Sequence, residues 1–117
     1  MRILNFGSLN LDHVYNVDHF VRTGETLGSL QYHQFCGGKG GNQSIALARA
    51  RAHVHHAGKI GRDGLALKER LEKDGVDTSL LEVVDGPSGH AIIQVDAAGQ
   101  NSIVLYPGAN TASHERR

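Results

Sequence analysis

Apolar residues recur along the 117-residue chain in short runs that predict alternating strands and helices. Residues 1–7 form one apolar run that closes at a glycine, and residues 54–60 form another, so each is typical of a buried strand. Between them, residues 42–52 are rich in alanine and other helix-forming residues. The pattern therefore predicts a strand, a helix and a second strand within the first half of the chain.

A second helix is predicted over residues 64–74, because Leu67 and Leu71 lie four positions apart and share one helix face. Asp63 stands where an N-cap is expected. Gly75 follows the last turn, where a left-handed residue commonly ends a helix.

The remaining apolar residues predict extended segments rather than helices. Residues 12–15 and 27–35 form one extended pair, residues 80–84 form a short strand, and residues 91–95 and 102–106 flank a turn as a hairpin. The alternation of strands and helices predicts an α/β fold with a parallel sheet and covering helices. The extended pair and the hairpin do not fit that alternation, so we expect a small separate β-layer that covers a site.

Charge and composition exclude several classes of function. Twelve basic and twelve acidic residues cancel, which argues against a nucleic-acid or anionic-membrane surface. The single cysteine, Cys36, excludes an internal disulfide framework, and no apolar run approaches the ~20 residues of a membrane span. The first residues lack the layout of a secretory signal, so we expect a cytoplasmic protein of one domain, or part of a larger one.

The fifteen glycines cluster in a segment that precedes the first helix. Four of them lie in residues 37–41 around Lys39, and Asn42 follows. Glycines let a backbone approach a ligand closely, and a helix N-terminus favours polar or anionic groups. The segment matches neither a P-loop nor a dinucleotide-binding fingerprint, because the required glycines and the Ser or Thr are not in place. We expect a loop over residues 36–41, with Asn42 able both to cap the helix and to contact a ligand.

Five blocks of sequence, in order along almost the whole chain, resemble the ribokinase-like (PfkB) family of sugar and nucleoside kinases. They are Gly7–His13, Thr23–Thr26, Gly37–Gln43, Gly58–Asp63 and Tyr106–Asn110. One glycine segment alone would be weak evidence, but five blocks at fitting spacings are specific.

The resemblance implies a Rossmann-like α/β domain with a β-sheet lid over a sugar site. Residues 1–117 would form the N-terminal part of one such domain, with lid segments at about 12–36 and 89–106. It implies that sugar hydroxyls are held by Asn10, Asp12, Gly38, Lys39, Gly40, Gly41 and Asn42. The chemistry agrees, since carboxylates accept hydrogen bonds from hydroxyls and amides both donate and accept them.

The family's catalytic machinery does not occur in this sequence. The Gly-Ala-Gly-Asp block that supplies the catalytic base, the ATP-binding loops, and the sites for Mg²⁺ and, in some members, a monovalent cation all lie in the C-terminal half of family members. We therefore expect the sugar-binding part of an ATP-dependent kinase for ribose or a similar pentose or ketohexose, with no catalytic or metal-binding residue of its own and no activity alone. The alternative is a non-catalytic sugar-binding or assembly module. Exposed apolar faces and a sheet edge predict a homo-oligomer, for which a dimer through the lid is one option.

Several other reactive residues are better explained by structural roles. His13 is expected to make a structural hydrogen bond, Cys36 to pack as a small buried residue, and His53 and His55 to bind no metal because a ligand set is incomplete. Arg51 replaces a glycine that the family usually places after the first helix. If Arg51 is left-handed, it costs up to about 1 kcal/mol relative to glycine.

Overall fold

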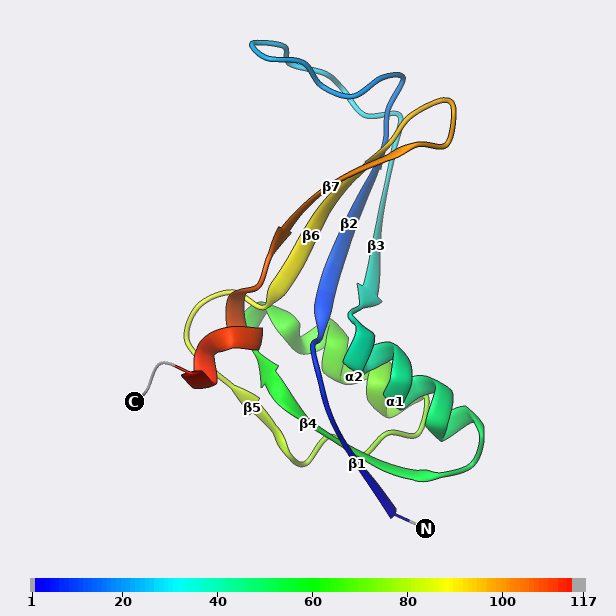
Figure 1. The fold of residues 1–117 in the computed structure, drawn as a ribbon, viewed down its shortest axis with the longest axis vertical. Coiled ribbons are helices and arrows are strands. Elements are labelled where there is room, and N and C mark those ends of the chain that lie inside the picture. Colours follow the sequence, from blue (N-terminus) through cyan, green and yellow to red (C-terminus); the bar gives the residue numbers. More distant parts are fainter. Residues whose placement is uncertain (1, 115–117) are drawn as a thin grey trace.

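The computed structural model describes residues 2–114, which form two sheets and two α-helices (Figure 1). The first sheet has the order β1-β4-β5, with strands Arg2–Phe6, His53–Ile60 and Leu81–Val83. All its pairings are parallel, as the strand–helix alternation predicts. The helices are α1 (Lys39–Arg49) and α2 (Leu65–Lys73).

Both helices pack on the same face of the first sheet. Val54, His56 and Ile60 are buried and alternate along β4, so their side chains point to one face. Val54 and Ile60 join Leu67 and Leu71 of α2 in the core, which confirms the face predicted for that helix. His56 contacts α1 through Ser44, and the opposite face carries the exposed side chains of β1.

The second sheet contains the predicted extended pair and hairpin, and it extends away from the first sheet (Figure 1). Its order is β3-β2-β6-β7, with strands Gln31–Gly37, Asn10–Asn16, Gly89–Val95 and Asn101–Tyr106. The two central strands, β2 and β6, are parallel, and both outer pairings are antiparallel. The predicted separate β-layer is therefore present, and its two parts join through β2 and β6.

The end of α2 confirms the left-handed residue predicted there, and the end of α1 shows that Arg51 is left-handed as well. Gly75 follows α2 with a φ of 89°, in the left-handed region. Arg51 follows α1 with a φ of 71°, and among the described residues it is the non-glycine with positive φ. The backbone of Arg51 is therefore strained, because its Cβ is unfavourable in a conformation that glycine adopts freely.

Three expectations about the helix starts are wrong. Helix α1 begins at Lys39, so two glycines of the predicted loop lie in its first turn, and Asn42 is inside the helix instead of capping it. Asp63 is not the N-cap of α2, because Gly64 holds that position after a short 3-10 helix over Arg62–Gly64. The Asp63 carboxylate instead accepts a hydrogen bond from the Ser88 amide, at 2.8 Å. Contacts with residues distant in sequence are thus present at both helix starts, with Gly7 and Ser8 at α1 and with Ser88 at α2.

The main hydrophobic core lies between the helices and the first sheet and extends to the residues that begin the second sheet. Leu9 and Leu11, at the start of the second sheet, are 1% and 3% exposed and join the core formed by α2 and β4. Cys36 is half-buried against this core, as expected of a packing residue, and burial raises the pKa of its thiol. Within residues 2–114, no helix is long and apolar enough to cross a membrane.

Candidate functional site

The end of β1 and the first turn of α1 approach each other closely enough to require glycine. A Cβ on Gly40 would lie 2.4 Å from the Gly7 carbonyl carbon, and a Cβ on Gly7 would lie 2.5 Å from the Gly40 Cα. The Gly41 amide donates to the Ser8 carbonyl at 3.1 Å. The first and third motif blocks, more than thirty residues apart in sequence, are thus in direct backbone contact.

A buried hydrogen-bonded network holds this contact in place. The Nε2 of His56 lies 3.2 Å from the Gly7 carbonyl oxygen, so this nitrogen must donate. The Nδ1 of the same ring then accepts a hydrogen bond from the Ser44 hydroxyl at 2.6 Å. The Asn5 amide donates to both the Ser44 Oγ and the Gly40 carbonyl, at 2.9 and 3.0 Å. Burial lowers the pKa of His56, and the hydrogen bond to Gly7 opposes this effect without cancelling it. The neutral ring is therefore favoured.

Asn10 and Asp12 lie two residues apart on β2, so their side chains share one face of the second sheet. The Asp12 carboxylate lies against Gly37, where a Cβ would come within 2.4 Å of Oδ2. Gly38 has a φ of 93°, and a Cβ there would meet the Ser8 carbonyl and the Asn10 amide. The side chain of Asp12 and the backbone of Asn10 are thus adjacent to the glycines that precede α1.

Burial raises the pKa of Asp12, and the nearby His13 opposes the rise. His13 itself makes a structural hydrogen bond, as expected, since its Nδ1 lies 2.7 Å from the Tyr32 hydroxyl. The half-buried carboxylate of Asp12 is suited to accept hydrogen bonds from a neutral hydroxylated ligand.

The predicted site residues differ in solvent exposure. Asn10, Asp12 and Gly38 are half-buried, Gly40 and Gly41 are buried, and the side chains of Lys39 and Asn42 are exposed on the first turn of α1. All seven lie along the junction of β2, β3 and α1, as their secondary-structure positions show. The structure therefore gathers them at one junction between the two sheets.

A cleft of about 530 Å³ lies toward the carboxyl ends of β1 and β4, and none of the seven predicted site residues lines it. Its lining includes Gly7, Ser8, Gly58, Lys59 and Asn110, which come from the first, fourth and fifth motif blocks. Ligands of open parallel sheets commonly bind at these strand ends. Ser8 and Asn110 were quoted in the motifs, but no role could be assigned to them without the fold.

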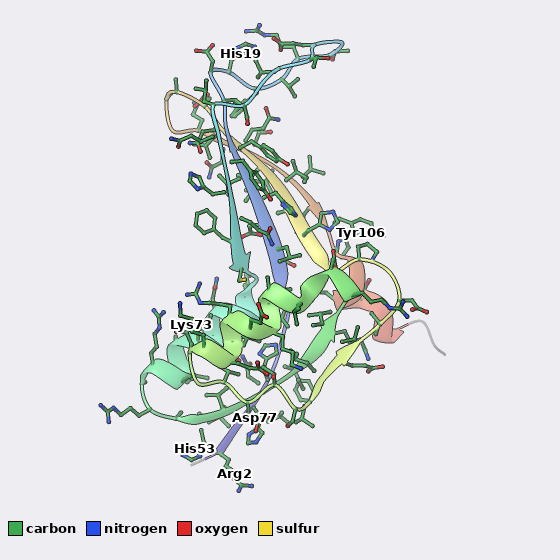
Figure 2. The ribbon with its side chains drawn as sticks, turned by 180° about the vertical axis from the view of Figure 1, so that it is seen from behind. Arg2, His19, His53, Lys73, Asp77 and Tyr106 are labelled. Carbon is green, nitrogen blue, oxygen red and sulfur yellow. The ribbon has the colours of Figure 1, made fainter. Side chains whose placement is uncertain are left out.

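The remaining histidines and acidic residues were considered as possible metal ligands. Among residues 2–114, no group of three or more His, Cys, Asp or Glu side chains is placed to hold a metal ion. His53 lies at the opposite end of the molecule from His19, as Figure 2 shows. His55 pairs with Asp77 at 3.4 Å, and His19 lies between Asp18 and Glu25, so these histidines have acidic partners in the fold.

Comparison with known proteins identifies the family. The profile described as "pfkB family carbohydrate kinase" matches residues 2–116. The chain belongs to the pfkB family of carbohydrate kinases. The fold and motif blocks inferred from the sequence are thereby confirmed at the level of the family.

Relatives within this family include several ribokinases. The chain is 43% identical to ribokinase of Haemophilus influenzae over 108 residues, covering 90% of this chain and 35% of that protein. It is 39% identical to ribokinase of Staphylococcus aureus over 113 residues, covering 93% and 37%. The chain thus spans about a third of the length of the curated relatives it matches.

Solved structures of ribokinases share the fold. Ribokinase of Cryptococcus neoformans in complex with ADP aligns with a TM-score of 0.86 and 48% identity, over 92% of this chain and 35% of that one. Ribokinase of Arabidopsis thaliana complexed with ribose and ATP aligns with a TM-score of 0.87 and 31% identity, over 93% and 36%.

Proposed function

We propose that this chain forms the acceptor-sugar part of an ATP-dependent sugar kinase that phosphorylates a hydroxyl of ribose or a similar pentose or ketohexose. The observation that carries the proposal is the junction itself, where Asn10 and Asp12 meet the glycines before α1. Support also comes from the ribokinases of similar sequence and from the relative solved with ribose and ATP.

In this proposal each residue of the junction has a separate task. Asp12 accepts hydrogen bonds from sugar hydroxyls, and Asn10 both donates and accepts. Gly38, Gly40 and Gly41 let the sugar approach the backbone, while Lys39 and Asn42 reach its edge from the first turn of α1. Phosphoryl transfer depends mainly on positioning, and these residues would position the accepting hydroxyl.

The binding of ATP, Mg²⁺ and a monovalent cation is a separate part of the proposal. No acidic cluster able to hold a metal ion occurs among residues 2–114, and the glycine segment is not a P-loop. We propose that nucleotide and ions bind to the parts of longer family members that this chain does not match, together with the catalytic base. A cytoplasmic location and a lid role for segments 12–36 and 89–106 are part of the same proposal.

Sugar binding is tested by thermal unfolding of the 117-residue chain with ribose, fructose, adenosine and tagatose phosphate. A sugar at 100 times its Kd adds about 2.7 kcal/mol of apparent stability. We expect ribose or a close analogue to raise Tm, and Asp12→Asn to abolish the rise. Asp85→Asn is the matched control, because Asp85 is exposed and pairs only with Arg62 among the described ion pairs. Equal shifts in both variants, or none with any sugar, would contradict the proposal.

Catalysis is tested separately by an ADP-release assay on the same chain. We expect no ADP formation above background with ribose, ATP and Mg²⁺, because the proposed catalytic base is not in this sequence. Sugar-dependent turnover would show that the chain itself carries the phosphoryl-transfer machinery.

We further propose that two copies associate through the second sheet. The face of this sheet that carries Asp12 also exposes Phe35, Ile103 and Leu105, at 54%, 57% and 59%. Apolar side chains gathered on one face favour association with another surface. Sedimentation should show self-association that Leu105→Lys weakens, and a monomer at all concentrations would contradict it.

A further inference from the structure

Asn110 connects the fifth motif block to the predicted sugar site across a hundred residues of sequence. Its side-chain amide makes three hydrogen bonds, two with the backbone of Leu9 and one with the side chain of Asn10, the first residue of β2. Leu9 N donates to the Asn110 Oδ1 at 2.9 Å, and the Asn110 Nδ2 donates to Leu9 O at 3.1 Å and to the Asn10 Oδ1 at 2.9 Å. The amide therefore pairs with the backbone of Leu9 much as a neighbouring strand would.

This pairing determines the orientation of both amides. Because the Leu9 amide can only donate and its carbonyl can only accept, the oxygen and nitrogen of Asn110 have one consistent assignment. The second hydrogen on the Asn110 Nδ2 is then directed at Asn10, whose oxygen must accept it. The Asn10 Nδ2 is then directed away from Asn110. It lies on the face of β2 that Asn10 shares with Asp12.

Asn110 is held in place because Pro87 and Ser88 connect the fourth motif block to the fifth. The Ala109 amide donates to Pro87 O at 3.0 Å, and the fully buried Ser88 hydroxyl accepts from the Gly61 amide at 2.8 Å. Asp63, which does not cap its helix, accepts from the Ser88 amide. The residues after β5 thus tie the segment before α2 to the segment that carries Asn110.

Gly89 leaves the space in which the two amides meet. A Cβ at this position would lie 2.2 Å from the Asn110 Nδ2 and 2.7 Å from the Asn10 Oδ1. Any other residue would push the two amides apart, so the contact depends on this glycine.

We propose that Asn110 is a positioning residue that fixes the Asn10 side chain with its Nδ2 toward the sugar. Asn10 then donates to one sugar hydroxyl while Asp12 accepts from a neighbouring hydroxyl. The site thereby selects a ligand that offers an acceptor and a donor side by side, as two adjacent hydroxyls do. The sugar part of this inference rests on the proposed function, whereas the orientation of Asn10 does not.

The decisive variant is Asn110→Asp, which has nearly the same size. An aspartate keeps the oxygen that accepts from Leu9 N, but it replaces the Nδ2 donor with a second acceptor. That oxygen would face Leu9 O and the Asn10 Oδ1, and two acceptors in contact are unfavourable. Asn10 is then expected to rotate and present its oxygen where it had presented its nitrogen. Asn101→Asp is the matched control, since Asn101 is exposed at the start of β7.

The first measurement needs no ligand. In ¹⁵N-labelled chain, nuclear Overhauser effects should connect the Asn110 side-chain amide protons to Asn10 and Leu9, and the Asn10 amide should be rigid. Asn110→Asp should change the Asn10 side-chain signals and their order parameter, whereas Asn101→Asp should leave them unchanged. Unchanged Asn10 signals in Asn110→Asp would overturn the proposal, whether or not any sugar binds.

The second measurement is a double-mutant cycle of ribose affinity with Asn10→Ala, Asn110→Asp and the combined variant. Each single change should weaken ribose binding by about tenfold, the effect of one hydrogen bond in a partly buried site. The combined variant should bind no more weakly than Asn10→Ala, because Asn110 acts through Asn10. Additive losses would show a purely structural role and overturn the proposal. If wild-type chain binds no ribose while the Asn10 signals respond as expected, the proposed function fails and the positioning role stands.

Discussion

The two sheets differ in how they are stabilised, and the candidate site lies where they meet. The first sheet has helices on one face and buries Val54 and Ile60 against Leu67 and Leu71 of α2. The second sheet exposes apolar side chains on both faces, such as Val104 at 69% and Leu105 at 59%. It is attached to the core at its root through Leu9 and Leu11. The packed part thus carries Lys39 and Asn42 of the candidate site on α1, and the exposed part carries Asn10 and Asp12 on β2.

Two histidines show the same contrast in electrostatic terms. His56 is fully buried in the packed part, and burial lowers its pKa. His19 lies at the far tip of the second sheet (Figure 2), where hydrogen bonds to Asp18 and Glu25 raise its pKa. The first environment favours the neutral ring, and the second favours the charged ring.

The largest expected effect separates the two regions by packing. Leu67→Ala removes a side chain that is 1% exposed, and it should lower the free energy of unfolding by about 2–5 kcal/mol. Val104→Thr, in the second sheet, should change it by less than about 0.5 kcal/mol. Urea unfolding of both variants measures the difference, and equal losses would show that the second sheet contributes to the same core.

A second substitution acts at the junction itself. Gly40→Ala places a methyl group against the Gly7 backbone, so it should cost about 1–3 kcal/mol in unfolding free energy. Gly28→Ala is the control, because a Cβ there meets nothing within 4 Å and its φ is not in the left-handed region. A Gly40→Ala variant as stable as Gly28→Ala would refute the close approach of β1 and α1.

A third substitution should stabilise the packed region. Arg51 has a φ of 71°, so Arg51→Gly should raise the free energy of unfolding by up to about 1 kcal/mol. Arg51→Ala keeps the Cβ and should give no such gain. Thermal unfolding compares them, and a gain from alanine as well as glycine would show that backbone strain is not the cause.

The smallest expected effect is the pH dependence of stability between pH 5 and 7. Because the folded pKa of His56 is lowered from 6.5, its contribution is present above that value and is lost as pH falls below it. The folded pKa of His19 is raised, so its contribution is present below 6.5 and is lost as pH rises through the folded pKa. His19→Asn should therefore steepen the acid loss of stability, and His56→Gln should reduce it. Identical pH profiles for the two variants would contradict the contrast.

Much of the fold could be predicted because local patterns and tertiary packing agree. The strand before Gly7, the shared face of Leu67 and Leu71 and the hairpin near residue 100 all follow from periodicity and turn residues. The helix starts could not be predicted. Glycines at 40 and 41 disfavour a helix locally, but the contacts with Gly7 and Ser8 hold them in one.

The family, the order of elements and the residues of the motif blocks could all be inferred from the sequence. What those blocks do for one another depends on tertiary contacts, because hydrogen bonds between segments 25 to 100 residues apart leave no periodic pattern in the sequence. Such hydrogen bonds join Asn110 to Asn10, His56 to the Gly7 carbonyl, and Asp63 to the Ser88 amide. They exist because the chain brings the ends of its strands to one junction, where buried polar groups must find partners.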